Sequence, residues 1–160
     1  MKDSHPIVKL NEAIGKGVAL FLLIPLIVIV TFDTVVRYAF NKPTLWGQEL
    51  STFLFGAYIL LGGAYTLAKG GHVRVDLLYV KMRGLAKKFA SIIGIGFVTT
   101  LGLILLWKGG EIAWRSIAML ERSGSVWNPP VYPVRCIIPI SGMLLLLQAY
   151  IELRKVIRDI

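Results

Sequence analysis

The carboxylates that could bind ions or relay protons lie near the ends of long apolar stretches. Asp33, Glu49, Asp76 and Glu111 each have a basic residue close in sequence, or one that the fold could bring near. A carboxylate that relays ions or protons through a membrane normally lies unpaired near the bilayer centre. No carboxylate in this sequence fits that description, so the pattern argues against an ion or proton pathway within the chain.

Other kinds of chemistry are equally poorly supported by the residue types. The two histidines, His5 and His72, both lie outside the apolar stretches, which excludes a bis-histidine haem site inside a helical bundle. The one cysteine, Cys136, cannot form an intrachain disulfide, and we expect it to pack as a small apolar residue. The sequence contains no zinc-binding cluster, phosphate-binding loop or nucleophile–base pair. We therefore predict no enzymatic activity, no cofactor and no metal site.

The elements that position these residues are four apolar stretches. They contain no Asp, Glu, Lys or Arg and comprise residues 17–32, 50–68, 89–107 and 136–151. About 20 apolar residues in a helix cross a hydrocarbon core roughly 30 Å thick. The chain is 56% hydrophobic, with a mean hydropathy of +0.69, and the stretches lack the polar face that a soluble four-helix bundle would keep. We predict an all-α integral membrane protein, one domain over residues 1–160, with spans at 13–36, 46–68, 88–108 and 135–152.

The net charge of +9 is better explained by topology than by nucleic-acid binding. With the N-terminus inside, twelve Lys and Arg residues fall on the cytoplasmic side and six on the other. This asymmetry predicts that both termini are cytoplasmic, with the basic segments contacting anionic lipids. The first span lacks a small-residue cleavage site, so we do not interpret it as a cleaved signal peptide.

Several local features of the first two spans suggest how their ends are organised. Pro25 removes a backbone hydrogen bond and predicts a kink in the first helix. Asp33 and Arg37 are four residues apart and can neutralise each other. Thr44 could cap the second helix, and Glu49 in its first turns could meet Arg37. The glycines of the second span, Gly56, Gly62 and Gly63, offer a thin side for a close helix contact.

Two amphipathic arm helices are expected at the membrane surfaces. Residues 73–87 form a basic, amphipathic stretch on the cytoplasmic side, although residues 81–89 could equally begin the third helix. Residues 109–122 continue the helical pattern past the third span, with Glu111 and Arg115 four apart, and Gly109-Gly110 could bend this segment into an outer arm. Residues 123–135 contain three prolines and are predicted to be non-helical.

A transporter acting alone is disfavoured by the apolar middles of the spans. Secondary transporters usually bind substrate near the midplane between repeats with broken helices. A small four-helix exporter needs a glutamate within its first helix, where residues 22–30 are fully apolar. The chain is therefore expected to be an accessory or scaffold subunit of a larger assembly.

Three motifs follow one another along the chain, each near the end of a span. The first, after span one, comprises Arg37, Tyr38, Phe40, Asn41, Pro43, Trp46 and Glu49. The second, after span two, contains His72, Arg74 and Asp76. The third, before span four, comprises Trp127, Pro129, Pro130 and Pro133, and Pro139 follows. In this order the motifs resemble the small membrane subunit (DctQ/SiaQ type) of tripartite ATP-independent periplasmic, or TRAP, transporters. The resemblance covers essentially the whole chain and implies a location in the inner (plasma) membrane of a prokaryote.

The resemblance implies a non-catalytic role. In such systems a large membrane subunit (DctM/SiaM type) carries the substrate and Na⁺ by an elevator motion. A periplasmic binding protein delivers an organic acid, such as a dicarboxylate, sialic acid or a sulfonate. The small subunit is expected to brace the large one and to help dock the binding protein. Na⁺ is therefore expected in the partner and not in this chain. The alternatives are a stand-alone small exporter and a structural subunit of another membrane complex.

The motif residues receive roles as hypotheses. Arg37, Asn41, Trp46 and Glu49 would form an outer polar cluster that fixes the first two helices and touches the binding protein, or one that only caps helices and neutralises charge. His72, Arg74 and Asp76 would lock the inner turn, with a simple Arg74–Asp76 pair as the plainer reading. Trp127, Pro129 and Pro130 would stiffen the outer loop.

Overall fold

The computed structural model describes residues 17, 19–42, 44–68 and 85–158, and the regular elements of this part are all helical. A short π-helix, η1 (Ala19–Leu23), runs directly into α2 (Ile24–Ala39). The other helices are α3 (Gly47–Ala68), α5 (Leu85–Ala118) and α6 (Tyr132–Arg158). The predicted all-helical fold is thus confirmed for the described residues. The second motif and most of the predicted cytoplasmic arm, residues 73–84, lie outside them.

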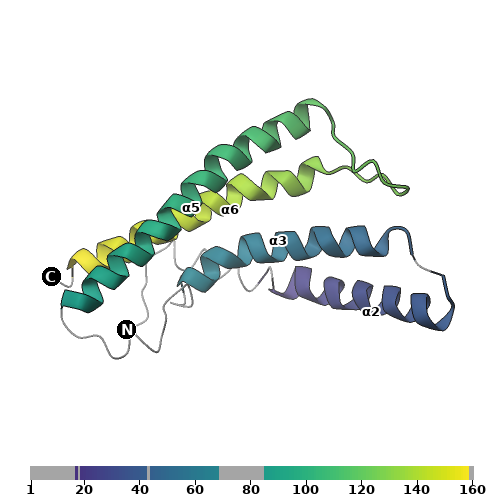
Figure 1. The fold of residues 1–160 in the computed structure, drawn as a ribbon, viewed down its shortest axis with the longest axis horizontal. Coiled ribbons are helices and arrows are strands. Elements are labelled where there is room, and N and C mark those ends of the chain that lie inside the picture. Colours follow the sequence, from purple (N-terminus) through teal and green to yellow (C-terminus); the bar gives the residue numbers. More distant parts are fainter. Residues whose placement is uncertain (1–16, 18, 43, 69–84, 159–160) are drawn as a thin grey trace.

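The helices form two antiparallel hairpins that lie side by side (Figure 1). Helix α3 packs against both α2 and α6, and α5 packs against α6. The spatial order is therefore α2, α3, α6, α5, which is an open row and not a closed bundle, because α2 and α5 make no extensive contact. In an open row, α2 and α5 at the two edges leave most of their apolar surface uncovered.

The closest packing joins α5 to α6 through glycines. A methyl group at Gly142 of α6 would lie 2.7 Å from the backbone nitrogen of Leu106 and 2.9 Å from the carbonyl oxygen of Gly102, both on α5. A methyl group at Gly109 would lie 2.5 Å from Cγ2 of Ile138. Small residues at a crossing let two membrane helices approach backbone to backbone. The glycines predicted for this task, Gly56 and Gly62 on α3, instead have no atom within 4 Å of an added methyl group.

The buried core lies along the same pair of helices. Val98 of α5 and Leu144, Leu145 and Ala149 of α6 are its buried members, and Leu61 of α3 packs against them. No residue of α2 is buried within the chain. The α5–α6 hairpin is therefore the internally packed half of the molecule.

The first helix changes from a π-helix to an α-helix at its proline, where the sequence predicts a kink. Pro25 lies in the first turn of α2, and the π-helical turn Ala19–Leu23 precedes it. A proline in a helix cannot donate a backbone hydrogen bond, and its ring crowds the carbonyl four residues earlier. The wider π turn gives that carbonyl room, so the helix changes type at the point where a kink was expected.

Two predicted boundaries near the third and fourth helices were wrong. Pro133 is helical, because α6 begins at Tyr132 and a proline in the first helical turn has no intrahelical bond to lose. Residues 109–118 do not bend into a separate arm, because α5 continues through Gly109-Gly110 to Ala118. Because Gly109 has no side chain, Ile138 of α6 can pack closely against α5 at this position.

A Schellman motif with a leucine in the glycine position ends α5. Leu120 adopts a left-handed φ of 46°, its amide donates to the Ile117 carbonyl, and the Glu121 amide donates to the Ser116 carbonyl. These two bonds satisfy carbonyls that the end of a helix leaves free. The predicted arm segment 109–122 is therefore the last turns of α5 followed by its cap.

Within the described residues, three helices are long and apolar enough to cross a membrane: Leu20–Ala39, Ala90–Ala118 and Tyr132–Arg154. The fourth, α3, has 22 residues and carries Gln48, Glu49, Ser51 and Thr52 in its first turns. Only 6% of the first apolar window is buried within the chain, and 17% of the second. Such exposed apolar helices are characteristic of a membrane protein, in which lipid or a partner covers them.

Candidate interaction site

One end of the molecule carries the α2–α3 turn and the α5–α6 loop (Figure 1). We call this the loop end. Of the residues predicted to form the site, Arg37, Trp46, Glu49 and Trp127 lie there within the described part of the chain. Pro43, His72, Arg74 and Asp76 lie outside that part.

Asp33 organises the α2–α3 turn. One carboxylate oxygen, Oδ2, accepts from Nη2 of Arg37 at 2.8 Å, which confirms the predicted i, i+4 pair. The other, Oδ1, accepts from both the backbone amide and the hydroxyl of Thr44. The Thr44 hydroxyl therefore ties the turn to α2 instead of capping α3. A charged acceptor with several donors is among the stronger polar contacts in a protein.

Aromatic and backbone contacts complete this turn. The Trp46 ring stacks on Phe32 of α2, with centroids 6.0 Å apart and an interplanar angle of 24°. Asn41 adopts a left-handed φ of 51°, which asparagine tolerates better than most residues, and so reverses the chain after α2. Tyr38 is 83% exposed. The predicted residues around this turn are thus close together, but each has a different partner.

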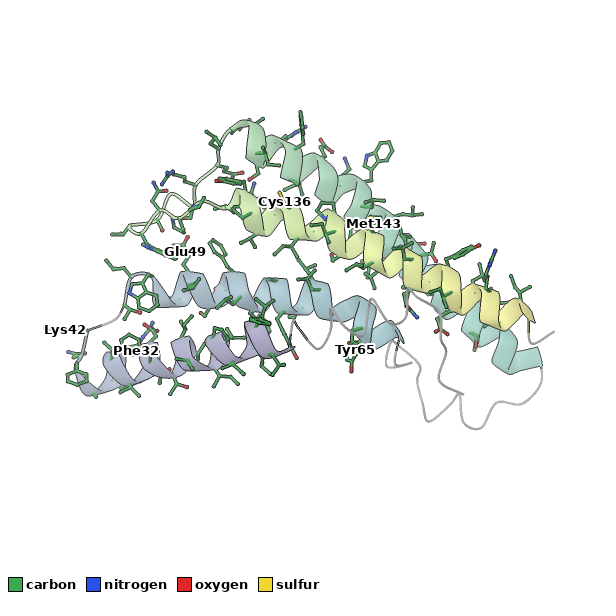
Figure 2. The ribbon with its side chains drawn as sticks, turned by 180° about the vertical axis from the view of Figure 1, so that it is seen from behind. Phe32, Lys42, Glu49, Tyr65, Cys136 and Met143 are labelled. Carbon is green, nitrogen blue, oxygen red and sulfur yellow. The ribbon has the colours of Figure 1, made fainter. Side chains whose placement is uncertain are left out.

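Glu49 joins the two hairpins. Its Oε2 accepts from the hydroxyl of Ser125 at 2.6 Å, a contact between residues 76 positions apart in sequence. Figure 2 shows Glu49 on the side of α3 that faces the α5–α6 loop. Because Arg37 pairs with Asp33, the alternative Glu49–Arg37 pair does not form between these described residues.

The α5–α6 loop is held by its own network of hydrogen bonds. Ser123 donates its amide to the Pro129 carbonyl at 3.1 Å, and Val131 donates to the Glu121 carbonyl at 3.0 Å. At the tip, the Asn128 side chain accepts from the Gly124 amide at 3.2 Å, and both residues have positive φ. Pro130 pairs with Arg122 across this narrow loop through an isolated β-bridge, and the rings of Pro129 and Pro130 restrict the backbone φ of its returning side.

Two polar pairs were not anticipated from the sequence. Glu121 at the start of the loop forms a salt bridge with Arg135 in the first turns of α6, and this pair closes the base of the loop. Deep in the α5–α6 hairpin, the fully buried Gln148 donates to Glu152 at 3.4 Å. Two sequence features could have indicated these pairs. Glu121 and Arg135 carry opposite charges on either side of the proline-rich loop, and Gln148 is an amide within an otherwise apolar stretch. The other predicted pair, Glu111 and Arg115, is confirmed at 2.7 Å.

The geometry at the loop end supports binding and positioning, and not catalysis. Asp33–Arg37 and Glu121–Arg135 are ion pairs, and Glu49 accepts from the Ser125 hydroxyl. The described residues contain no group of three or more His, Cys, Asp or Glu side chains placed to hold a metal ion. What the site offers is a rigid, partly aromatic platform, with Val126 82% exposed and Trp127 41% exposed at its tip.

Comparison with known proteins identifies the family. Residues 26–159 match the family described as "Tripartite ATP-independent periplasmic transporters, DctQ component". The chain is 26% identical over 101 residues to a sialic acid TRAP transporter small permease protein, SiaQ, of Vibrio cholerae; this covers 59% of the chain and 58% of the relative. It is 21% identical over 96 residues to a C4-dicarboxylate TRAP transporter small permease protein, DctQ, of the same organism; this covers 60% of the chain and 41% of the relative.

These matches agree with the resemblance that the three motifs indicate. The aligned parts span less than two thirds of each relative, whereas the family match extends from the start of α2 to the end of α6. The matched family consists of components of transporters and not of enzymes. The four-helix chain described here therefore belongs to the DctQ family of small TRAP transporter membrane components.

Proposed function

We propose that this chain is a non-catalytic small permease subunit that braces the large membrane subunit of a TRAP transporter. The main support for this proposal is the open row of helices, in which no residue of α2 is buried within the chain. A subunit whose edge helix is apolar and uncovered needs lipid or a partner helix beside it. The family membership supplies the class of partner, a large DctM/SiaM-type subunit.

The loop end supports the second part of the proposal, docking of the periplasmic binding protein. The α2–α3 turn and the α5–α6 loop lie at the same end of the molecule, and the Glu49–Ser125 hydrogen bond holds them to each other. A docking surface benefits from such preorganisation, because less conformational entropy is lost when the partner binds. With both termini cytoplasmic in the inner membrane, this end faces the periplasm, as the positive-inside rule requires.

The transport reaction itself belongs to the assembled system in this proposal. The large subunit carries Na⁺ and an organic acid of the dicarboxylate, sialic acid or sulfonate class, and the binding protein delivers that acid. The SiaQ and DctQ relatives are named for sialic acid and C4-dicarboxylate systems, which supports this range of substrates. In this proposal the chain holds the large subunit in place and helps to position the binding protein.

Reconstitution tests the proposal. We expect Na⁺-driven uptake of the organic acid only when this chain, a large subunit of the DctM/SiaM type and the binding protein are all present in the vesicle assay. Transport by this chain alone would instead favour a stand-alone exporter. Stable assembly with a different membrane complex and not with the large subunit would favour a structural subunit of that complex.

Charge reversal tests the loop end. Glu49→Arg and Arg37→Glu are each expected to lower uptake. The first removes the carboxylate that accepts from the Ser125 hydroxyl, and the second removes the cation that pairs with Asp33. Glu49→Gln is the matched control, since its carbonyl can still accept from Ser125. Full uptake by both reversal variants would show that this polar site plays no part in transport.

A further inference from the structure

The side of α5 opposite α6 carries a second organised surface. Helix positions that face α6, such as Gly109 and Ser116, are buried. Trp107 and Trp114, seven residues and two turns apart, point the other way and are 78% and 73% exposed. Trp107, Lys108, Glu111, Trp114 and Arg115 therefore share one face of α5, away from α6.

The charges on this face form a single triad. Glu111 accepts from Nζ of Lys108 at 3.1 Å and from Nη2 of Arg115 at 2.7 Å. The side chains of Lys108 and Arg115 remain 67% and 69% exposed. Two cations share one carboxylate, so the triad keeps a net positive charge between the two tryptophans.

The chemistry changes in order along this face. Phe97, Leu101 and Ile104, one to three turns earlier, are 74%, 47% and 54% exposed. A helix that leaves a bilayer meets hydrocarbon first, then the zone that favours tryptophan, then the headgroup phosphates that favour Lys and Arg. The sequence of side chains on α5 follows that order.

The length of α5 adds a geometric constraint. Its apolar window, Ala90–Ala118, has 29 residues, or about 43 Å at 1.5 Å per residue, whereas the hydrocarbon core is about 30 Å thick. Trp107 and Trp114 lie about 10 Å apart along the axis. Residues 89–106, the uncharged part of the chain before Trp107, are about 27 Å long as a helix, so the hydrocarbon core ends near Trp107. Within the usual tilt range of 0–40°, Trp114 then lies about 8–10 Å farther out, at the headgroup edge of the interface.

We propose that the Trp107–Arg115 face of α5 is a phospholipid-binding surface. Trp107 lies at the hydrocarbon edge of the interface at the loop end, Trp114 lies at its headgroup edge, and Lys108 and Arg115 bind headgroup phosphates. The net positive charge favours an anionic phospholipid over a neutral one.

Depth-dependent fluorescence quenching tests the placement of the rings. The chain contains four tryptophans, and single-tryptophan variants retain Trp107 or Trp114 with the others replaced by phenylalanine. The full chain is reconstituted in phosphatidylcholine vesicles that contain phosphatidylglycerol and lipids brominated at shallow, middle or deep acyl positions. We expect shallow bromine to quench both rings most strongly, with Trp107 about 8–10 Å deeper than Trp114. Strongest quenching of either ring by deep bromine, or a Trp114 that bromine does not quench, would overturn the proposal.

Removing the cations tests the headgroup contact. Brominated phosphatidylglycerol is expected to be enriched about fivefold over brominated phosphatidylcholine around Trp114. The double variant Lys108→Gln/Arg115→Gln should lose this enrichment, whereas Lys42→Gln, an exposed cation on the α2–α3 turn, should keep it. Equal quenching by the two lipids in the unmodified charge background would refute the anionic preference.

The complex provides the last arm of the test. The two single-tryptophan variants are measured again after co-purification with the large subunit. Bromine quenching that persists supports a lipid surface, and quenching that disappears from both rings shows that this face is a protein interface and overturns the proposal. Co-purification is read separately, so failure of the lipid surface leaves the bracing function intact.

Discussion

Replacing Gly142 by alanine is expected to push α5 and α6 apart. The new methyl group would lie 2.7 Å from the backbone nitrogen of Leu106 and 2.9 Å from the carbonyl oxygen of Gly102. Comfortable contacts begin at about 3.5 Å, and both obstacles are backbone atoms that cannot rotate away, so the helices must separate by roughly 0.6–0.8 Å. Overpacking of this kind costs about 1–3 kcal/mol.

Alanine also favours the helical state, and that gain must be separated from the steric cost. A Gly→Ala change inside a helix stabilises by up to about 1 kcal/mol. Gly110 is the matched control, since it also lies within a helix and an added methyl group there meets no atom within 4 Å. Gly110→Ala should therefore show the helix gain alone, and Gly142→Ala should be less stable than this control by about 1–3 kcal/mol.

The two variants are compared by SDS titration in dodecyl maltoside micelles, followed by far-UV circular dichroism. Retention of the folded species on size exclusion after heating gives a second measure of stability. Equal stability of Gly142→Ala and Gly110→Ala, within about 0.5 kcal/mol, would refute the backbone contact between α5 and α6.

Three further substitutions test single contacts by the same unfolding assay or by hydrogen exchange. Ser116 is fully buried and its hydroxyl has no hydrogen-bond partner in the structure, so Ser116→Ala should stabilise by about 1 kcal/mol; Ser141→Ala, which removes a 2.7 Å bond to the Ile138 carbonyl, should not. Leu120→Gly should stabilise by about 1 kcal/mol, because glycine adopts the observed φ of 46° without strain. Ser125→Ala should speed amide exchange in the α5–α6 loop, because it removes the bond to Glu49.

Each of these predictions has a contrary outcome. A loss of stability in Ser116→Ala equal to that in Ser141→Ala would mean that the Ser116 hydroxyl has a partner after all. A destabilised Leu120→Gly would show that the exposed leucine side chain, through membrane contact, outweighs the strain of its backbone. Unchanged exchange in Ser125→Ala would mean that the internal hydrogen bonds of the loop suffice to order it.

Local patterns predicted the helices and the ion pairs that lie within one helix. Asp33–Arg37 and Glu111–Arg115 are both confirmed, because residues four apart in a helix are neighbours whatever the rest of the chain does. The predicted second span, residues 46–68, differs from α3 by one residue at its start. Boundaries failed at prolines: Pro133 looked like a helix breaker but is harmless in the first turn of α6.

Contacts between distant segments were beyond such patterns. Glu49 was expected to meet Arg37, whereas the fold gives it Ser125, 76 positions away. The glycines of α3 looked suited to a close crossing, but the crossing uses Gly102, Gly109 and Gly142. A glycine allows a neighbouring helix to pack closer, but it does not determine which helix packs there.

The amino-acid sequence by itself determined that this chain is a helical membrane protein whose polar residues lie at the helix ends. That follows because hydropathy acts residue by residue over each apolar stretch, without reference to neighbours in space. The tertiary structure decided that the helices form an open row with α5 and α6 as its packed half, and that Glu49 fastens one hairpin to the loop of the other. Those choices depend on which faces meet, and shape complementarity between helix faces exists only once the helices are placed together.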